Sequence, residues 1–88
     1  MSEEREFKVG IYRHFKGGMY RTYEMATDSE TGKTMVVYRS MQNNRLYVRP
    51  FGMFMSEVDR EKYPDAKQKY RFEFVWNIYF GGNFRSDK

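Results

Sequence analysis

Residues 11–21, which read IYRHFKGGMYR, place the chain's one histidine, His14, among cationic and aromatic side chains. An imidazole in such a setting could transfer a proton, ligate a metal ion or hydrogen-bond an anion. Nucleophilic catalysis also needs a nucleophile and an orienting acid beside the base, and residues 7–23 contain no Asp or Glu. We therefore predict no catalytic residues and a protein that is not an enzyme; a small enzyme that uses His14 is the least favoured alternative.

Metal and nucleotide sites are also disfavoured. One histidine and no cysteine cannot form a zinc site without several carboxylates, so we predict no metal and no cofactor. Residues 29–34, SETGKT, look like part of a phosphate-binding loop. That motif needs a glycine five residues before its Gly-Lys pair, where this chain has Thr27, and a helix after it. We predict a hairpin turn instead, and no nucleotide at Lys33.

The net charge of +4 is unevenly distributed along the 88 residues. Residues 7–23 and 31–56 carry eight Lys or Arg and no acid, whereas the remaining residues carry eight basic and twelve acidic side chains. One interpretation is an ordinary solvated surface, and the other is an electropositive face that attracts an anionic partner. The eight cations are Lys8, Arg13, Lys16, Arg21, Lys33, Arg39, Arg45 and Arg49.

Candidate binding residues come from these acid-free segments and from the tyrosines between them. The functional interpretation is one electropositive, aromatic-lined surface that binds an anion or a base. The alternative is that His14 ends a strand, hydrogen-bonded to the backbone or to a tyrosine hydroxyl, while the tyrosine rings belong to the core. Strand alternation places Arg13 and His14 on opposite faces unless a bulge redirects one of them. The candidates are Tyr12, Arg13, His14, Lys16, Tyr20, Tyr38, Arg39 and Arg49.

These residues would be positioned by strands, because hydrophobic residues recur with a period of two over most of the chain. Glycine pairs and Asn- or Asp-containing turns separate the segments. Pro50 should end the fourth strand and lead into a helical turn with Phe51 and Phe54 at one end of the barrel. A further short helix is expected from Ser56, ending before Pro64. The expected strands are residues 8–15, 19–27, 34–41, 45–49 and 69–80.

Residues 70–80, YRFEFVWNIYF, show the clearest alternation in the chain. A helix would scatter these aromatic residues around its circumference, so we predict a strand with one buried face. On that face Phe72, Phe74 and Trp76 should enter the core, followed by Ile78 and Phe80.

The predicted fold is all-β: a strongly bent five-stranded antiparallel sheet, close to a small SH3-like barrel, with one or two short helical turns before the last strand. The length favours a single domain over residues 1–88, with residues 1–6 and 83–88 frayed. The absence of cysteine, of a signal-peptide pattern and of a long apolar run favours a cytoplasmic protein without membrane contact.

Four motifs also carry a resemblance: GxYRHFKGxxY, SETGxxxVVYR, VRPxxMF and YPDAKQKYRFE. Over residues 8–74 the chain resembles a bacterial family of small β-rich domains of undetermined function. Family members commonly have Trp where this chain has Tyr47, and residues 75–84 extend beyond the usual end of the family. The resemblance implies a fold but no activity.

Three functions therefore compete. The leading hypothesis is a non-enzymatic binding module for an anionic partner, such as RNA or DNA, in which cations meet phosphates and exposed aromatic rings stack on bases. The second is a protein- or peptide-interaction module that uses an aromatic groove or a sheet edge. The third is the enzyme that uses His14.

Overall fold

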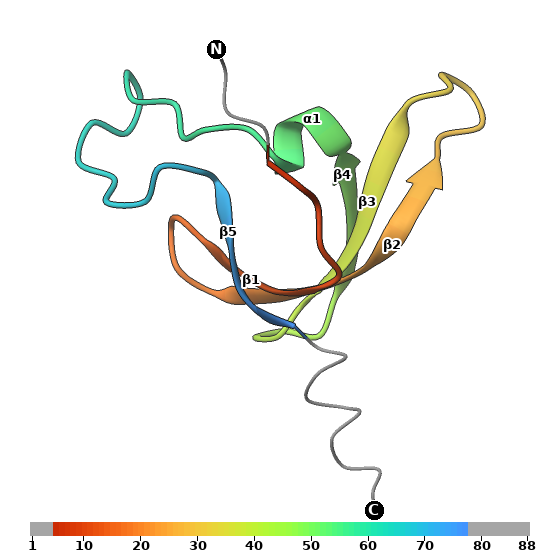
Figure 1. Cartoon of the computed structure of the whole chain (residues 1–88), viewed down its shortest axis with the longest axis horizontal. Helices are drawn as coiled ribbons and strands as arrows, with labels where there is room; N and C mark the ends of the chain where they lie inside the picture. The colour runs from red at the N-terminus through yellow and green to blue at the C-terminus, as the bar shows by residue number, and fades with distance from the viewer. Residues whose placement is uncertain (1–4, 78–88) are drawn as a thin grey trace, which may run out of the picture.

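The computed structural model describes residues 5–77 and forms one bent antiparallel sheet with a short helix (Figure 1). The strand order is β4-β3-β2-β1-β5, so four consecutive strands form a meander and the last strand returns beside the first. Among residues 5–77 no backbone pairing joins β4 to β5, so the sheet is not closed. The predicted all-β class and bent five-stranded sheet are confirmed. The elements are β1 (Gly10–His14), β2 (Met19–Thr27), β3 (Thr34–Ser40), β4 (Leu46–Pro50), α1 (Phe51–Phe54) and β5 (Phe72–Asn77).

Tight turns connect the meander. Between β1 and β2, Gly17 and Gly18 have φ values of 104° and 93°, which residues with a Cβ rarely adopt. The turn between β2 and β3 is held by the Asp28 carboxylate, which accepts the backbone N–H of Glu30 at 2.9 Å. β3 follows this turn at Thr34. Residues 28–33 therefore connect two antiparallel strands, as the predicted hairpin turn requires, while the lack of nucleotide binding stays a prediction.

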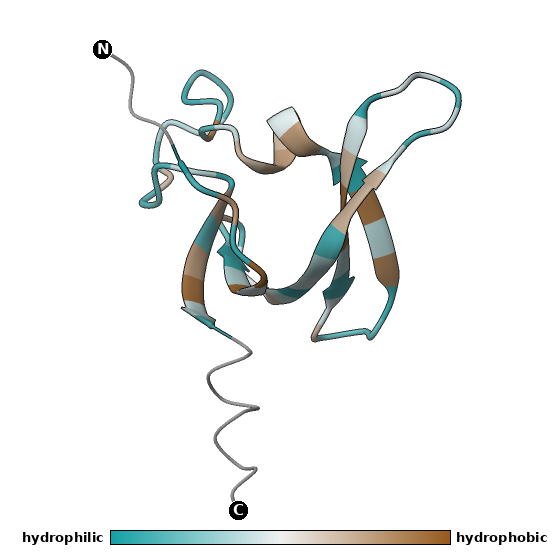
Figure 2. Cartoon of the chain, turned by 45° about the vertical axis from the view of Figure 1, so that its right-hand side comes forward, coloured by the Kyte–Doolittle hydropathy of each residue, from teal (hydrophilic) through white to brown (hydrophobic). Residues whose placement is uncertain are grey.

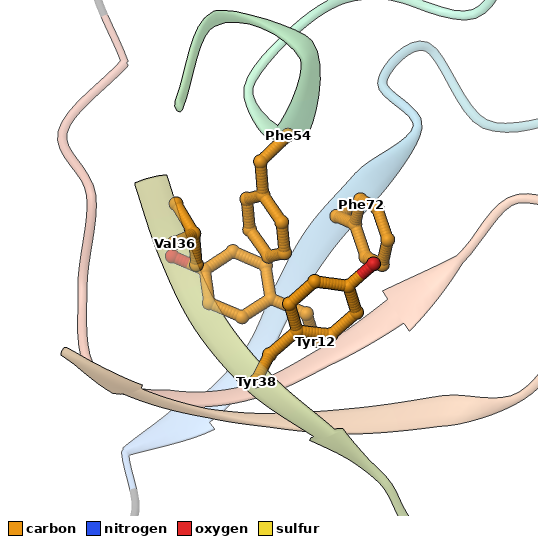
Figure 3. Packing of buried hydrophobic residues seen from close by; sticks show 5 residues of the cluster. All are labelled: Tyr12, Val36, Tyr38, Phe54 and Phe72. Atoms are coloured by element: carbon orange, nitrogen blue, oxygen red, sulfur yellow. The ribbon is translucent and has the colours of Figure 1, made fainter. Parts of the chain in front are cut away.

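The core lies on the concave face of the sheet. Five buried side chains meet there, and α1 covers them (Figures 1 and 3). Phe54 of α1 stacks on Phe72 of β5 with ring centroids 4.1 Å apart. The helical turn predicted after Pro50 is confirmed, because α1 begins at Phe51. Hydrophobic and hydrophilic bands alternate along the strands (Figure 2), as a sheet with one face on the core requires. The five core residues are Tyr12, Val36, Tyr38, Phe54 and Phe72.

β5 departs from the predicted alternation. Phe72 is buried and Phe74 is half-buried, but the side chain of Trp76 is 52% exposed. The pairing with β1 shifts at Ile11 and Tyr12: Tyr12 pairs with Phe74, whereas Ile11 pairs with Trp76. Val75 is thus an extra residue, and the resulting bulge turns Trp76 to the outer face. The predicted burial of Trp76 is wrong, and Ile78 and Phe80 lie outside the described residues.

The helix predicted from Ser56 is also wrong. Val58 N–H donates to the Lys69 carbonyl at 2.9 Å, and Arg71 N–H donates to the Ser56 carbonyl at 3.0 Å. The segment after α1 therefore pairs with the segment before β5 instead of coiling. Two turns remain, in which Tyr63 N–H donates to the Asp59 carbonyl at 2.8 Å and Ala66 N–H donates to the Tyr63 carbonyl at 3.2 Å.

Fraying is expected for residues 1–6 and 83–88, of which only two fall within the described residues. Arg5 is held in place: its guanidinium donates to the carbonyls of Met55, at 2.7 Å, and Phe72, at 2.6 Å. No helix within residues 5–77 is long and apolar enough to cross a membrane.

Candidate functional site

Strand alternation divides the candidate residues between the two faces of the sheet. Tyr12, His14, Tyr20, Tyr38 and Arg49 share the concave face, as their pairing partners show. Arg13 and Arg39 occupy the outer face, and Lys16 lies in the β1–β2 turn. The expectation of one surface that holds His14 and the four candidate cations Arg13, Lys16, Arg39 and Arg49 is therefore corrected. No bulge lies between Arg13 and His14, so they face in opposite directions.

The concave group surrounds the open side of the sheet between β4 and β5, and we call it the rim cluster: His14, Tyr20, Tyr38, Tyr47, Arg49 and Phe72. The Arg49 guanidinium lies 5.7 Å from the centre of the Phe72 ring, and its Nε donates to the Tyr38 hydroxyl at 3.2 Å. His14 contacts Phe72 edge-on, with ring centroids 4.8 Å apart. Arg49 thus reaches from one unpaired sheet edge toward the other.

His14 occupies an electropositive position in the rim cluster. Burial, and then the charges of Arg49, Lys16 and Arg71, lower the pKa of His14 to about 4. Its Nδ1 accepts the backbone N–H of Lys16 at 3.1 Å, which leaves the proton on Nε2. His14 is therefore neutral at physiological pH, and it is bonded to the backbone at the end of β1.

Two further candidates, Tyr12 and Lys16, have structural contacts. The Tyr12 hydroxyl donates to the Lys8 carbonyl at 2.9 Å and accepts the Lys8 N–H at 3.0 Å, and burial raises the pKa of this phenol. Lys16 lies with its Nζ 4.8 Å from the centre of the Tyr63 ring, and its hydrogen bond to the Tyr63 hydroxyl lowers the pKa of that phenol.

The outer face carries a cleft of about 570 Å³, which we call the arginine cleft. It lies over β2, β3 and the turn that leads to β4. None of its lining residues is acidic. They are Arg21, Tyr23, Arg39, Ser40, Met41 and Asn44.

Two arginines of this cleft are direct neighbours across the sheet. Arg21 of β2 pairs with Arg39 of β3, and like charges placed opposite each other destabilise a sheet. The Tyr23 ring lies beside both, 4.9 Å from the guanidinium of Arg21 and 5.7 Å from that of Arg39. The Tyr23 hydroxyl also accepts Nε of Arg39 at 3.0 Å. The cleft thus places two guanidinium groups, each with several N–H donors, beside each other, and no carboxylate lines it.

A bulge in β2 positions this tyrosine. The register between β2 and β3 shifts between Thr22 and Glu24, so Tyr23 is an extra residue of β2 beside the arginine pair. One terminal nitrogen of Arg39 donates to the Asn44 carbonyl at 2.8 Å, and Asn44 has a positive φ of 62°. The bulge and the turn together fix the direction of Arg39.

Arg21 and Tyr23 are the charged and aromatic residues of the arginine cleft that the sequence interpretation did not include among its candidates. Arg21 was within an acid-free segment, and the pattern MYRTYEM places Arg21 and Tyr23 on one strand face. What the pattern lacked was the register with β3, which decides that Arg21 faces Arg39 rather than Arg13. Among residues 5–77 no group of three potential metal ligands occurs.

Comparison with known proteins identifies the domain but not its role. The model of a family described as "Protein of unknown function (DUF1653)" matches residues 10–74. The chain belongs to this family. A crystal structure of a DUF1653 protein from Bordetella bronchiseptica resembles this structure with a TM-score of 0.70 at 28% sequence identity, covering 83% of this chain and 92% of that chain. Among curated proteins, none matches. The DUF1653 match includes every residue of the rim cluster and of the arginine cleft.

Proposed function

We propose that this DUF1653 protein is a non-enzymatic binding module for an anionic partner. The observation that carries the proposal is the pairing of Arg21 with Arg39 in a cleft lined by no acid. Side by side, two guanidiniums repel each other, and a shared anion would relieve that repulsion. Arginine forks suit carboxylate and phosphate oxygens, which they bind in pairs.

The rim cluster supports the same conclusion from the other face. His14 is influenced by three cations, Arg49, Lys16 and Arg71, which all act against its protonation. A catalytic imidazole would instead need a pKa near the working pH and a partner that orients it. The His14 ring accepts its hydrogen bond from the Lys16 backbone N–H, not from an orienting acid. We therefore propose no role for His14 in proton transfer.

Binding of fluorescent polyanions tests the proposal. Oligothymidine and oligoglutamate are titrated with the protein at about 50 and about 200 mM salt, because anion contacts make affinity salt-dependent. We expect at least one probe to bind, with affinity falling as salt rises. Replacing both arginines, R21Q with R39Q, should weaken that binding by at least about tenfold.

A matched variant controls for net charge. Lys62→Gln with Lys67→Gln removes two positive charges from the exposed loop before β5 and should change the affinity much less than the cleft variant. Equal effects of the two variants, or no binding of either probe at low salt, would contradict the proposal.

A further inference from the structure

β4 is an edge strand whose outer backbone groups are unpaired within residues 5–77. It pairs with β3 alone. Ser40 N–H donates to the Arg45 carbonyl at 2.9 Å, and backbone groups of alternate residues point to the same side of a strand. The N–H and C=O groups of Leu46 and Val48 therefore point away from β3, where another strand could pair with them.

The side chains of this edge are unusually apolar for an exposed surface. Leu46 is 53% exposed and Val48 is 60% exposed. Val37 of β3 lies opposite Val48 on the same outer face, and the exposed Met41 continues the surface toward the turn. We call Val37, Met41, Leu46 and Val48 the aliphatic strip. Proteins usually protect such edges with charge, proline or a covering segment, and here Pro50 ends the strand.

Charge decides which strand would pair there. Arg39 lies opposite Leu46, so the arginine cleft adjoins the aliphatic strip, and Arg45 immediately precedes β4. A second copy of this chain fits poorly, because pairing two β4 edges would bring the arginines of both copies together. Glu24 lies opposite Val37, and its carboxylate would repel an acidic side chain at that end of the strip. Acidic side chains of a partner therefore belong at the other end, near Arg39.

Nucleic acid fits this surface less well than protein does. Base recognition on a single strand relies on aromatic faces that are free to stack. The aromatic residue of the arginine cleft, Tyr23, already has the two guanidiniums beside its ring, and the residues of the strip are aliphatic. Aliphatic side chains and an open edge are instead the features used when an extended peptide adds to a sheet.

We infer that the outer edge of β4 docks an extended segment of another protein as an additional strand, whose outer-face side chains are aliphatic along the aliphatic strip and acidic at the end beside Arg39. This inference rests on the proposed function, because the arginine cleft supplies the contact with the acidic side chains. The aliphatic strip receives the apolar residues of the segment, and the backbone groups of Leu46 and Val48 provide the pairing.

Fluorescence anisotropy with three synthetic peptides tests the inference. The parent probe carries valine at the alternate positions that face the aliphatic strip and glutamate on the same face at the end beside Arg39. The other two probes have the same sequence with N-methyl groups on one or the other set of alternate residues, which removes the N–H donors of one edge. Strand addition depends on backbone hydrogen bonds. Methylation of the set of residues whose N–H groups face β4 should therefore weaken binding at least about tenfold. Methylation of the other set leaves the pairing edge intact and should have a smaller effect.

A protein variant tests the same contact from the other side. Val48→Pro removes an outward N–H from an edge strand, where proline is tolerated, and should weaken binding of the parent peptide by a similar factor. Val48→Ala keeps the N–H and serves as its control. Should the proline variant fail to fold, the methylated peptides still decide the question with the natural protein.

The outcomes separate this inference from the proposed function. Equal affinity for the parent peptide and both methylated peptides, with dependence on Arg21 and Arg39, would overturn edge docking and leave anion binding in place. Binding of oligothymidine without binding of the glutamate–valine peptide would also overturn edge docking, in favour of nucleic acid. Binding of no anionic probe would overturn both.

Discussion

At the scale of single residues, environment decides what the ionisable groups can do. His14 lies among rings and cations, and it is neutral because burial disfavours its charged form and because protonation would place another charge beside Arg49. Arg21 and Arg39 show the opposite situation, since they keep their charges side by side on an open face. The residue that first suggests chemistry, the histidine, is thus less prepared to act than two arginines in neighbouring strands.

The titration of His14 can be observed directly, because the chain has one histidine. We expect its imidazole NMR signals to titrate with a midpoint near 4, well below the usual value of about 6.5. A midpoint between about 6 and 7 would show that the three cations and the surrounding rings do not act on it.

The same shift makes stability depend on pH. The folded pKa is depressed, so the stabilising contribution is complete above the unfolded pKa of about 6.5 and is lost as pH falls toward the folded value. His14 is only half-buried, and solvent screening reduces the contribution to on the order of 1 kcal/mol. In urea unfolding, the free energy of unfolding of the native protein, relative to that of His14→Gln, should therefore fall by about this amount between pH 7 and pH 4.

At the scale of elements, two bulges set what each strand presents. The bulge at Tyr23 places that ring beside the arginine pair, and the bulge at Val75 turns Trp76 outward. Both alter the direction of a side chain without ending the strand.

Trp76 reports on the β5 bulge, since it is the one tryptophan of the chain. Its fluorescence should have a red-shifted, solvent-like maximum and be quenched readily by iodide, because half of the side chain is exposed. Trp76→Ala should cost less than about 1 kcal/mol of unfolding free energy, whereas Phe72→Ala should cost about 3–5 kcal/mol. Blue-shifted emission that resists quenching would show that Trp76 is buried and would contradict the bulge in β5.

Gly10 tests the close approach of β1 to β5. A Cβ added at Gly10 would lie 2.6 Å from the Trp76 carbonyl oxygen and 2.6 Å from a ring carbon of Phe74. Gly10→Ala should therefore destabilise the protein by about 1–3 kcal/mol. Gly52 of α1 is the matched control, because a Cβ there meets nothing within 4 Å, and Gly52→Ala should be neutral or stabilising. Similar losses from both substitutions would contradict this account.

Sequence periodicity predicts the strands well and their register poorly. The pattern from Thr34 to Ser40 identifies β3 because one face is buried, but one extra residue in β2 or β5 leaves composition and turn signals unchanged. The helix expected from Ser56 had adequate local signals, and it was lost to long-range pairing with residues 69–71. The arginine cleft could not be assembled from the sequence for the same reason: Arg39 was identified, whereas its pairing with Arg21 depends on a register that no local pattern encodes.

At the scale of the whole molecule, α1 and β5 together complete the core. Phe54 comes from the helix and Phe72 from the last strand, and their rings stack almost in parallel, with 9° between the planes. Phe54 also contacts Tyr12 and Tyr38, with ring centroids 5.1 and 5.4 Å away. A small open sheet thereby obtains a dense aromatic interior.

This packing predicts coupling between the two phenylalanines. Phe54→Ala alone should cost about 3–5 kcal/mol, because the residue is fully buried. In a double-mutant cycle with Phe72→Ala, the combined loss should be smaller than the sum by about 0.5–1.5 kcal/mol, since each single substitution already removes the stack. Purely additive losses in urea unfolding would show that the rings stabilise the core independently.

The return of β5 to β1 also determines the order in which the chain can fold. Tyr12 pairs with Phe74, far along the chain, whereas β2, β3 and β4 pair with their sequence neighbours. Closing so long a loop costs entropy before any contact repays it, so we expect the meander to form first and the β1–β5 ladder last. On the ribosome, the concave aromatic face must wait for Phe72 to be synthesised, and until then the nascent chain exposes the surface that the finished protein buries.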